Sequence, residues 1–133
     1  YVTFFMGILD VGAHTFEYVN AGHNPPVFLN SDTELTLLKT GGPLIGMFPG
    51  LTYQPETLHL NSGDFIFCYT DGVTETFNRK KEEFGEERLN EFLVKNYPDT
   101  LENLTGSLVW DLNTFTGVSN HSDDVTMLIL RSI

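Results

Sequence analysis

The sequence predicts an α+β fold: many antiparallel strands, then a pair of helices, then a last strand that returns to the sheet. Three observations predict it. Short apolar or alternating segments separated by Gly, Pro and Asn turns fill residues 2–70, two amphipathic stripes lie within residues 86–117, and an apolar run starts at Val125. Strands followed by helices are typical of layered α+β domains. With 133 residues, the chain is one domain or a large part of one.

The first half of the chain predicts two hairpins. Residues 2–9 (VTFFMGIL) are apolar enough for an interior strand, and they pair across a turn with the alternating segment 16–20. Residues 27–29 and 35–38 flank an Asn-Ser-Asp turn and form the second hairpin.

A loop and two further strands follow. The Gly- and Pro-rich segment 41–50 predicts a packed irregular loop, and it lacks the Lys and helix start of a phosphate-binding loop. Residues 53–60 form the next strand. Residues 65–69 (FIFCY) form an unbroken apolar run, typical of a strand covered on both faces in the middle of a sheet. Cys68, the only cysteine, permits no intrachain disulfide and is expected to be a buried, unreactive thiol.

Two helices are predicted before the last strand. Apolar residues at i, i+3 and i+4 predict the first over residues 86–96, ended by Pro98. Asp99 and Glu102 predict a capping box for the second helix, which ends near Gly117. Its apolar stripe consists of Leu101, Leu104, Leu108, Leu112 and Phe115. Trp110 is assigned to the core rather than to a site.

Acidic residues stand at the ends of two of these strands. Asp71 follows the strand 65–69, whereas Asp123 and Asp124 precede the strand that starts at Val125. If the two strands are antiparallel neighbours, the end of the first lies beside the start of the second. Crowded carboxylates repel one another unless a cation neutralises them. A metal site with Asp71 and Asp123 as ligands is therefore predicted, while a simple Asp-Gly turn remains the alternative for Asp71.

A histidine lies in a proline-containing bend between the two predicted hairpins. His23 and Asn24 precede two consecutive prolines, which exclude a central strand there. A lone loop histidine is usually just exposed. We nevertheless predict that His23 and Asn24 border the metal site without being ligands.

The composition disfavours several partners. The formal net charge of -11, from 18 acids against 7 bases, is a poor match for a phosphate backbone, so nucleic acid is not an expected partner. No apolar run approaches the roughly 20 residues that span a bilayer, and no secretory signal pattern opens the sequence. A cytoplasmic setting fits these features.

Four motifs occur in a familiar order: residues 20–26 (NAGHNPP), 69–75 (YTDGVTE), 84–89 (FGEERL) and 123–126 (DDVT). Together they resemble the SpoIIE-type branch of the metal-dependent PPM (2C-like) serine/threonine phosphatases, over essentially the whole chain. The resemblance implies two stacked antiparallel sheets flanked by helices. It implies two Mn²⁺ or Mg²⁺ ions that activate a water toward a phosphoserine or phosphothreonine protein, such as an anti-anti-sigma factor.

The same resemblance places metal ligands at Asp71 and Asp123, with Asp124 as the near alternative for the second position. It assigns no separate catalytic residue to this chain. The family's upstream Gly-Asp-x-x-Gly-His-Gly motif, whose acid bridges the metals, does not occur in the 133 residues. The chain is therefore expected to be the C-terminal portion of a phosphatase domain, with its N-terminal part missing.

Such a portion is expected to be inactive by itself and to self-associate as a dimer, with the apolar run 2–9 at the contact. Two alternatives to an enzyme stay open. One is a pseudo-phosphatase that serves as an interaction module without turnover. The other is a structural β-sandwich whose acids are only surface turns.

Overall fold

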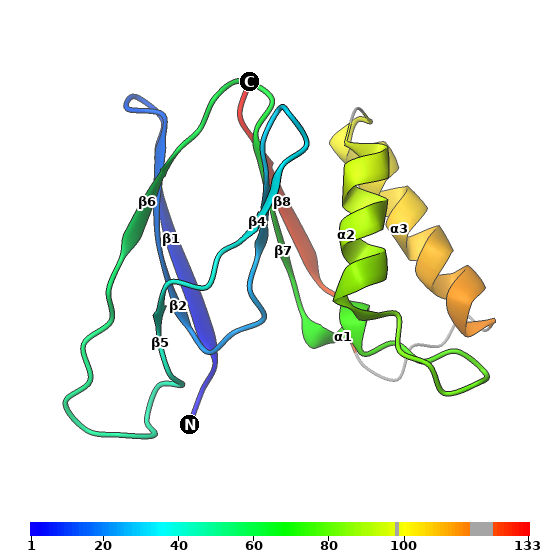
Figure 1. Cartoon of the computed structure of the whole chain (residues 1–133), viewed down its shortest axis with the longest axis horizontal. Helices are drawn as coiled ribbons and strands as arrows, with labels where there is room; N and C mark the ends of the chain where they lie inside the picture. Colours follow the sequence, from blue (N-terminus) through cyan, green and yellow to red (C-terminus); the bar gives the residue numbers. More distant parts are fainter. Residues whose placement is uncertain (98, 118–123) are drawn as a thin grey trace. The chain divides into compact units, whose positions relative to one another are not determined.

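The computed structural model describes residues 1–97, 99–117 and 124–133 and has the predicted α+β class (Figure 1). The elements in chain order are β1 (Phe4–Asp10), β2 (Thr15–Ala21), β3 (Val27–Leu29), β4 (Leu35–Leu37), β5 (Gly41–Gly42), β6 (Glu56–His59), β7 (Phe65–Tyr69), α1 (Asp71–Thr74), α2 (Gly85–Asn96), α3 (Leu101–Thr116) and β8 (Met127–Arg131). The chain forms two compact units. Unit 1 comprises residues 1–66 and 130–133, and unit 2 comprises residues 67–129.

The first sheet lies in unit 1 and is built around β2. β1 pairs with β2 in antiparallel register from Phe4 opposite Ala21 to Asp10 opposite Thr15, which confirms the predicted hairpin. On its other side, β2 pairs antiparallel with β6 and, over two residues, parallel with β5. β6 is shorter than the predicted strand 53–60, since Pro55 cannot donate to a ladder.

The prediction that residues 2–9 form an interior strand is wrong in its burial. β1 is an edge strand in the described part of the chain, and all of its residues except Phe5 are exposed. Phe5 points toward the core, where its ring stacks on Phe16 and Tyr18. Alternate residues Phe4, Met6 and Ile8 lie on the opposite face and are each about half exposed. An apolar pattern predicts the strand, but it does not supply the partner that would cover it.

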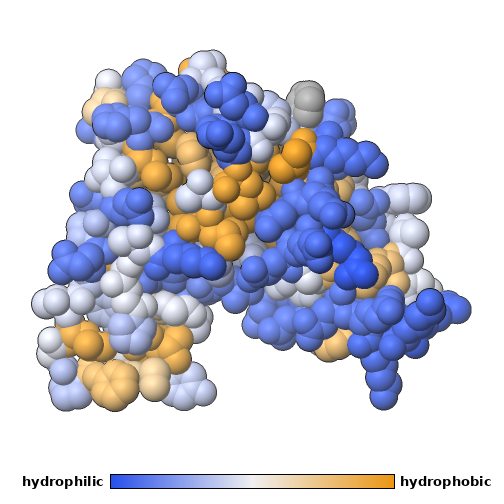
Figure 2. Space-filling model, viewed as in Figure 1, coloured by the Kyte–Doolittle hydropathy of each residue, from blue (hydrophilic) through white to orange (hydrophobic). Residues whose placement is uncertain are grey.

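The loop 41–50 also differs from its prediction. The prediction that it packs through its apolar residues is wrong for Met47 and Phe48, which are 49% and 58% exposed. Figure 2 shows this part of unit 1, at the lower left, as an orange patch among white and blue surface. Glycines with positive φ at Gly46 and Gly50 give the segment an irregular path.

The second sheet has the strand order β4-β3-β7-β8. β7 is buried along its whole length except for Cys68, which is half-buried, so the predicted central strand is confirmed. Two backbone hydrogen bonds show that β8 runs antiparallel to it: Ser132 N donates to Asp64 O, and Thr70 N donates to Thr126 O. The strand pairing that the metal prediction assumed is therefore present.

Two helices in unit 2 bury the predicted stripes. α2 buries Leu89, Phe92 and Leu93. α3 buries Leu104, Leu108 and Leu112, and Leu101 and Phe115 are half-buried. As predicted, α3 ends at Gly117, which takes a left-handed conformation (φ 68°) and donates its N–H to Asn113 O.

Two predictions about α3 are wrong. The N-cap is Thr100 rather than Asp99, because the Thr100 hydroxyl accepts the Asn103 N–H at 3.3 Å. Trp110 is 67% exposed and does not belong to the core. Trp110 and its neighbour Val109 lie on the solvent side of the helix, because the buried stripe passes through Leu108 and Leu112.

Candidate metal site at two strand ends

Asp71 lies where the chain leaves the second sheet. β7 ends at Tyr69, Thr70 is the N-cap of α1, and Asp71 is the first residue of that one-turn helix. The turn is closed by Val73 N donating to Thr70 O at 3.0 Å and by Glu75 N donating to Asp71 O at 2.7 Å. The Asp71 side chain is exposed, whereas Gly72, Val73 and Thr74 behind it are buried. The buried turn thus fixes the backbone position from which the exposed Asp71 side chain extends.

Thr70 joins this turn to the segment that carries the second acid cluster. Its N–H donates to Thr126 O at 3.1 Å. Its hydroxyl donates to Asp124 O at 3.0 Å and accepts the Thr126 N–H at 3.0 Å. All of these residues belong to unit 2. The end of β7 and the approach to β8 are therefore held side by side at the residues next to Asp71 and Asp124.

The second predicted ligand, Asp123, lies outside the described residues, so its role stays a prediction. Asp124, the alternative, is described and exposed. Among the described residues no group of three or more His, Cys, Asp and Glu side chains is placed to hold a metal ion. Of the predicted ligands, the described residues include Asp71 and the alternative Asp124.

Asp64, at the other end of β7, shows what a purely structural acid looks like in this chain. It is 1% exposed, and its carboxylate accepts the N–H groups of Ser31 and Asn61 at 3.0 and 2.8 Å. The bond to Asn61 closes the turn that precedes β7, and the bond to Ser31 ties this turn to the β3–β4 turn. Asp71 differs in both respects, since it is exposed and its side chain makes no hydrogen bond or ion pair with the described residues. A simple turn-closing role therefore describes Asp64 better than Asp71.

The oxygen-only character of the candidate ligands fits a hard divalent cation. Mg²⁺ and Mn²⁺ take carboxylate and water oxygens, and Mg²⁺ usually keeps several waters beside one or two carboxylates. An exposed carboxylate at the rim of a buried turn leaves room for those waters. Two carboxylates alone do not fill a six-coordinate shell, so the described residues fit part of such a site and not a complete one.

The His23–Asn24 bend is held by a residue that the sequence analysis did not single out. Asn20 is 4% exposed, and its side chain accepts the His23 N–H at 2.8 Å while donating to His23 O at 3.1 Å and to Leu38 O at 3.0 Å. The bend belongs to unit 1 and Asp71 to unit 2. The prediction that His23 and Asn24 border the metal site therefore stays a prediction. A buried Asn at the start of a proline-containing bend was the available signal.

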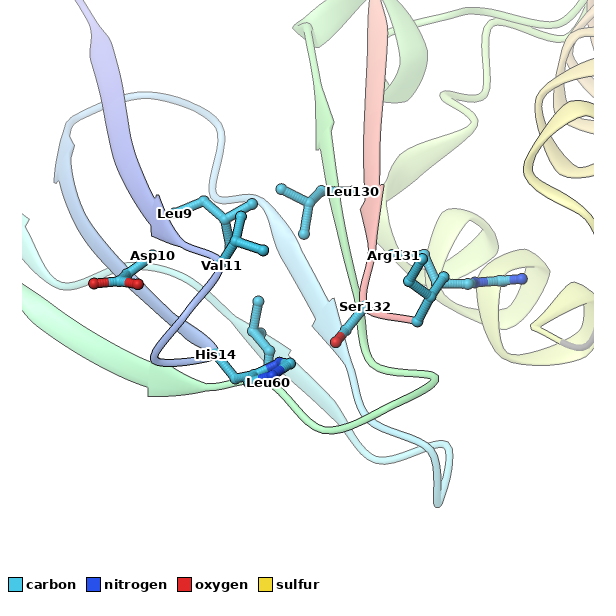
Figure 3. A pocket seen from close by; sticks show the side chains of 9 residues that line it. Leu9, Asp10, Val11, His14, Leu60, Leu130, Arg131 and Ser132 are labelled. Carbon is cyan, nitrogen blue, oxygen red and sulfur yellow. The ribbon is translucent and has the colours of Figure 1, made fainter.

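Unit 1 also contains an apolar cavity of about 220 Å³ between the β1–β2 turn, Leu60 and the end of β8. In Figure 3, Leu9, Val11 and Leu130 converge on it, whereas the guanidinium of Arg131 points away. None of the predicted ligands lines it. With aliphatic walls and no cluster of acids, the cavity is unsuited to a metal or a phosphoryl group.

Comparison with known proteins decides the family. The profile of the family described as "Stage II sporulation protein E (SpoIIE)" matches residues 1–132. The chain belongs to the SpoIIE family. It is 36% identical over 128 residues to Protein IcfG of Synechocystis sp. and 29% identical over 135 residues to the phosphoserine phosphatase RsbU of Bacillus subtilis. These matches cover 96% and 98% of this chain but only 20% and 39% of the two relatives, so the chain spans well under half of their length.

Solved structures share the fold. The SiaA-PP2C domain of Pseudomonas aeruginosa superimposes with a TM-score of 0.77 at 20% identity, over 96% of this chain and 50% of that one. The RsbU and RsbW domains of Rv1364c from Mycobacterium tuberculosis give 0.73 at 28% identity, over 98% and 36%. The predicted resemblance to PPM-type phosphatase domains is therefore confirmed at the level of family and fold. No helix among the described residues is long and apolar enough to cross a membrane.

Proposed function

We propose that this SpoIIE-family chain supplies part of the metal site of a phosphoserine or phosphothreonine protein phosphatase. Asp71 and Asp123 are the proposed ligands, with Asp124 as the alternative to Asp123. The observation that carries the proposal is the attachment of Thr70 to Asp124 and Thr126, which brings two acid-bearing strand ends together. The family membership supplies the reaction class.

The cations proposed for the site are Mn²⁺ or Mg²⁺, two in a complete domain. When bound, such ions would lower the pKa of a coordinated water and neutralise charge on a phosphoryl group. The contribution of this chain is to hold carboxylates at a defined spacing. Because a lone pair of carboxylates binds these ions weakly, the chain by itself is proposed to bind at most one ion loosely and to lack turnover.

The proposed substrate is a phosphorylated protein, such as an anti-anti-sigma factor, in a bacterial signalling pathway of the cytoplasm. The relative RsbU is named a phosphoserine phosphatase, which supports this class of substrate. The net charge of -11 supports a protein partner over a nucleic acid. The His23–Asn24 bend is proposed to border the site, because the Asn20 side chain holds it in a defined conformation through two bonds to the His23 backbone and one to Leu38 O.

A pseudo-phosphatase, an interaction module without turnover, is the second candidate. The coding sequence on the amino-terminal side of Tyr1 distinguishes the two. The complete motif there supports an enzyme of which this chain is the C-terminal portion. The same motif with its aspartate replaced supports an interaction module without turnover.

Self-association is proposed for the chain through β1. Support comes from its position at a sheet edge and from the exposure of Phe4, Met6 and Ile8 on one face. The edge strand carries one charge, Asp10, at its end. Such a strand lacks the lysines and prolines with which proteins usually protect an edge.

One paired experiment tests the proposal on the 133-residue chain. Light scattering gives its oligomeric state, and hydrolysis of a phosphoserine protein in excess Mn²⁺ gives its activity. We expect a dimer without turnover. A monodisperse monomer that hydrolyses the phosphoprotein would contradict both the partial site and the proposed contact. In a longer protein that contains the complete motif, Asp71→Asn should abolish turnover and Asp32→Asn, on the exposed β3–β4 turn, should not.

A further inference from the structure

Thr70 occupies a helix N-cap but does not use its side chain as a cap. A threonine at this position ordinarily accepts a backbone N–H from the first turn of its helix. Here the residue has the extended conformation of an N-cap (φ -91°, ψ 161°), and no side-chain capping bond is made to α1. The hydroxyl instead spans to the neighbouring segment, where it donates to Asp124 O and accepts from Thr126 N.

These two bonds have a consequence for the spacing of the acids. The backbone bond from Thr70 N to Thr126 O continues the ladder between β7 and β8 by one step. A ladder bond alone leaves the chain beyond Thr126 free to turn away from β7. The hydroxyl adds a hydrogen bond to Asp124 O, two residues before Thr126. This bond keeps the backbone of Asp124 beside the start of α1.

We propose that Thr70 is a positioning residue that fixes the start of α1, with Asp71, against the segment 124–126. The inference rests on the proposed metal function of Asp71, but the contact itself does not. Thr70 has no role as a ligand, because its hydroxyl is occupied by two backbone groups. Its action on the metal is indirect, through the place at which the two strand ends present their oxygens.

Three variants separate this role from a general structural one. Thr70→Ser keeps the hydroxyl, whereas Thr70→Val keeps the β-branched shape and the backbone bond but removes the hydroxyl. Thr76→Val is the matched control. Thr76 is 2% exposed, and its hydroxyl donates to Gly72 O at 2.7 Å, so its loss also costs a buried hydrogen bond in unit 2. Among the described residues, Thr76 bonds Gly72 and Phe84 and makes no hydrogen bond to residues 124–126.

The first readout is hydrogen exchange of the Thr126 amide, followed by NMR without metal. Thr70→Val should speed this exchange at least fivefold, the effect of losing one typical hydrogen bond. Thr70→Ser and Thr76→Val should leave it within twofold of the starting protein. Unchanged exchange in Thr70→Val would overturn the proposal that the Thr70 hydroxyl fixes the segment 124–126, independently of the result for Mn²⁺ binding.

The second readout is Mn²⁺ binding by the folded chain, followed through the loss of the free-ion electron paramagnetic resonance signal. Thr70→Val should weaken binding at least tenfold, the usual cost of losing a residue that orients metal ligands, and Thr70→Ser should restore it. Faster Thr126 exchange with unchanged Mn²⁺ binding would overturn the positioning role. If the 133-residue chain binds no Mn²⁺, the binding readout is made on a longer protein that contains the Gly-Asp-x-x-Gly-His-Gly motif. Binding there that is unchanged by Asp71→Asn would contradict the proposed metal function, while the exchange result decides the Thr70 contact separately.

Discussion

β1 and β7 have similar sequences and opposite environments. Phe4–Asp10 reads FFMGILD and Phe65–Tyr69 reads FIFCY, and both are apolar enough for an interior strand. In the structure β7 lies between β3 and β8 and is almost wholly buried. β1 has a neighbour on one side in the described sheet and is almost wholly exposed. An apolar run therefore predicts a strand reliably, but its burial depends on what the rest of the chain places beside it.

The largest expected effect contrasts one phenylalanine from each strand. Phe67 is 0% exposed, so Phe67→Ala leaves a cavity in the core and should lower the free energy of unfolding by about 3–5 kcal/mol. Phe4 is 49% exposed, and Phe4→Ala should cost less than about 1 kcal/mol. Urea denaturation followed by circular dichroism measures both. Equal losses would mean that β1 is covered as well as β7.

The second prediction concerns Cys68 in β7. Burial raises the pKa of its thiol to about 11, and burial with the nearby Glu86 carboxylate raises the pKa of Tyr69 to about 12. An unfolded cysteine has a pKa of about 8.5, so the folded thiolate fraction at pH 8 is lower by a factor of a few hundred. Alkylation by iodoacetamide should be correspondingly slow in the native chain and fast in urea.

The same raised pKa values set the direction of the pH dependence. The unfolded chain releases these two protons at lower pH than the folded chain does, so the folded state binds more protons in alkaline solution. The free energy of unfolding should therefore be fully retained below about pH 8.5 and fall as the pH rises toward 12. Native labelling as fast as in urea, or a Cys68→Ser chain with the same alkaline loss, would speak against a protected thiol.

The third prediction separates the two faces of β1. A Cβ added at Gly7 would lie 2.0 Å from Cζ of Phe16, whose ring is 7% exposed. Gly7→Ala must displace that ring and should cost about 1–3 kcal/mol. Met6→Ala, on the outward face next to it, should cost less than about 1 kcal/mol. Thermal unfolding gives the order, and a larger loss for Met6→Ala would show that the outward face is the packed one.

The smallest expected effect on stability comes with a change in association. Met6→Lys places a charge on the exposed face of the edge strand and should change the free energy of unfolding of the monomer, measured at low protein concentration, by no more than about 0.5 kcal/mol. It should nevertheless abolish the proposed self-association. Val109→Lys on α3 is the control, since Val109 is also partly exposed, at 40%. A dimer that survives Met6→Lys and is lost in Val109→Lys would move the contact to α3.

Much of the local structure could be predicted from the sequence because its signals are local. The β1–β2 hairpin, the β3–β4 hairpin, both helix stripes and the Gly117 stop each follow from the spacing of nearby residues. What failed depended on distant partners. The exposure of β1 and of Trp110 is decided by neighbours that a periodic pattern does not specify.

The site follows the same division. Asp71 could be singled out because an acid at the end of a buried strand is a local anomaly, and its strand pairing with β8 could be assumed from two apolar runs. The contribution of Thr70 could not, since its hydroxyl bonds residues 54 and 56 positions away. Asn20 left a local signal, because it precedes the proline-containing bend and bonds His23 three positions on, but its bond to Leu38 is not local. A hydroxyl or amide in a sequence does not reveal which distant backbone group it meets.

A map of where Mn²⁺ binds tests most directly whether the two strand ends form part of a metal site. Paramagnetic broadening of amide NMR signals reports proximity even when affinity is low. The amides of Gly72, Asp124 and Val125 should lose intensity first, Asp71→Asn should remove this effect, and Asp32→Asn should preserve it. Broadening that persists in Asp71→Asn, or that centres on Asp32, would contradict the claim that these two strand ends form part of a metal site.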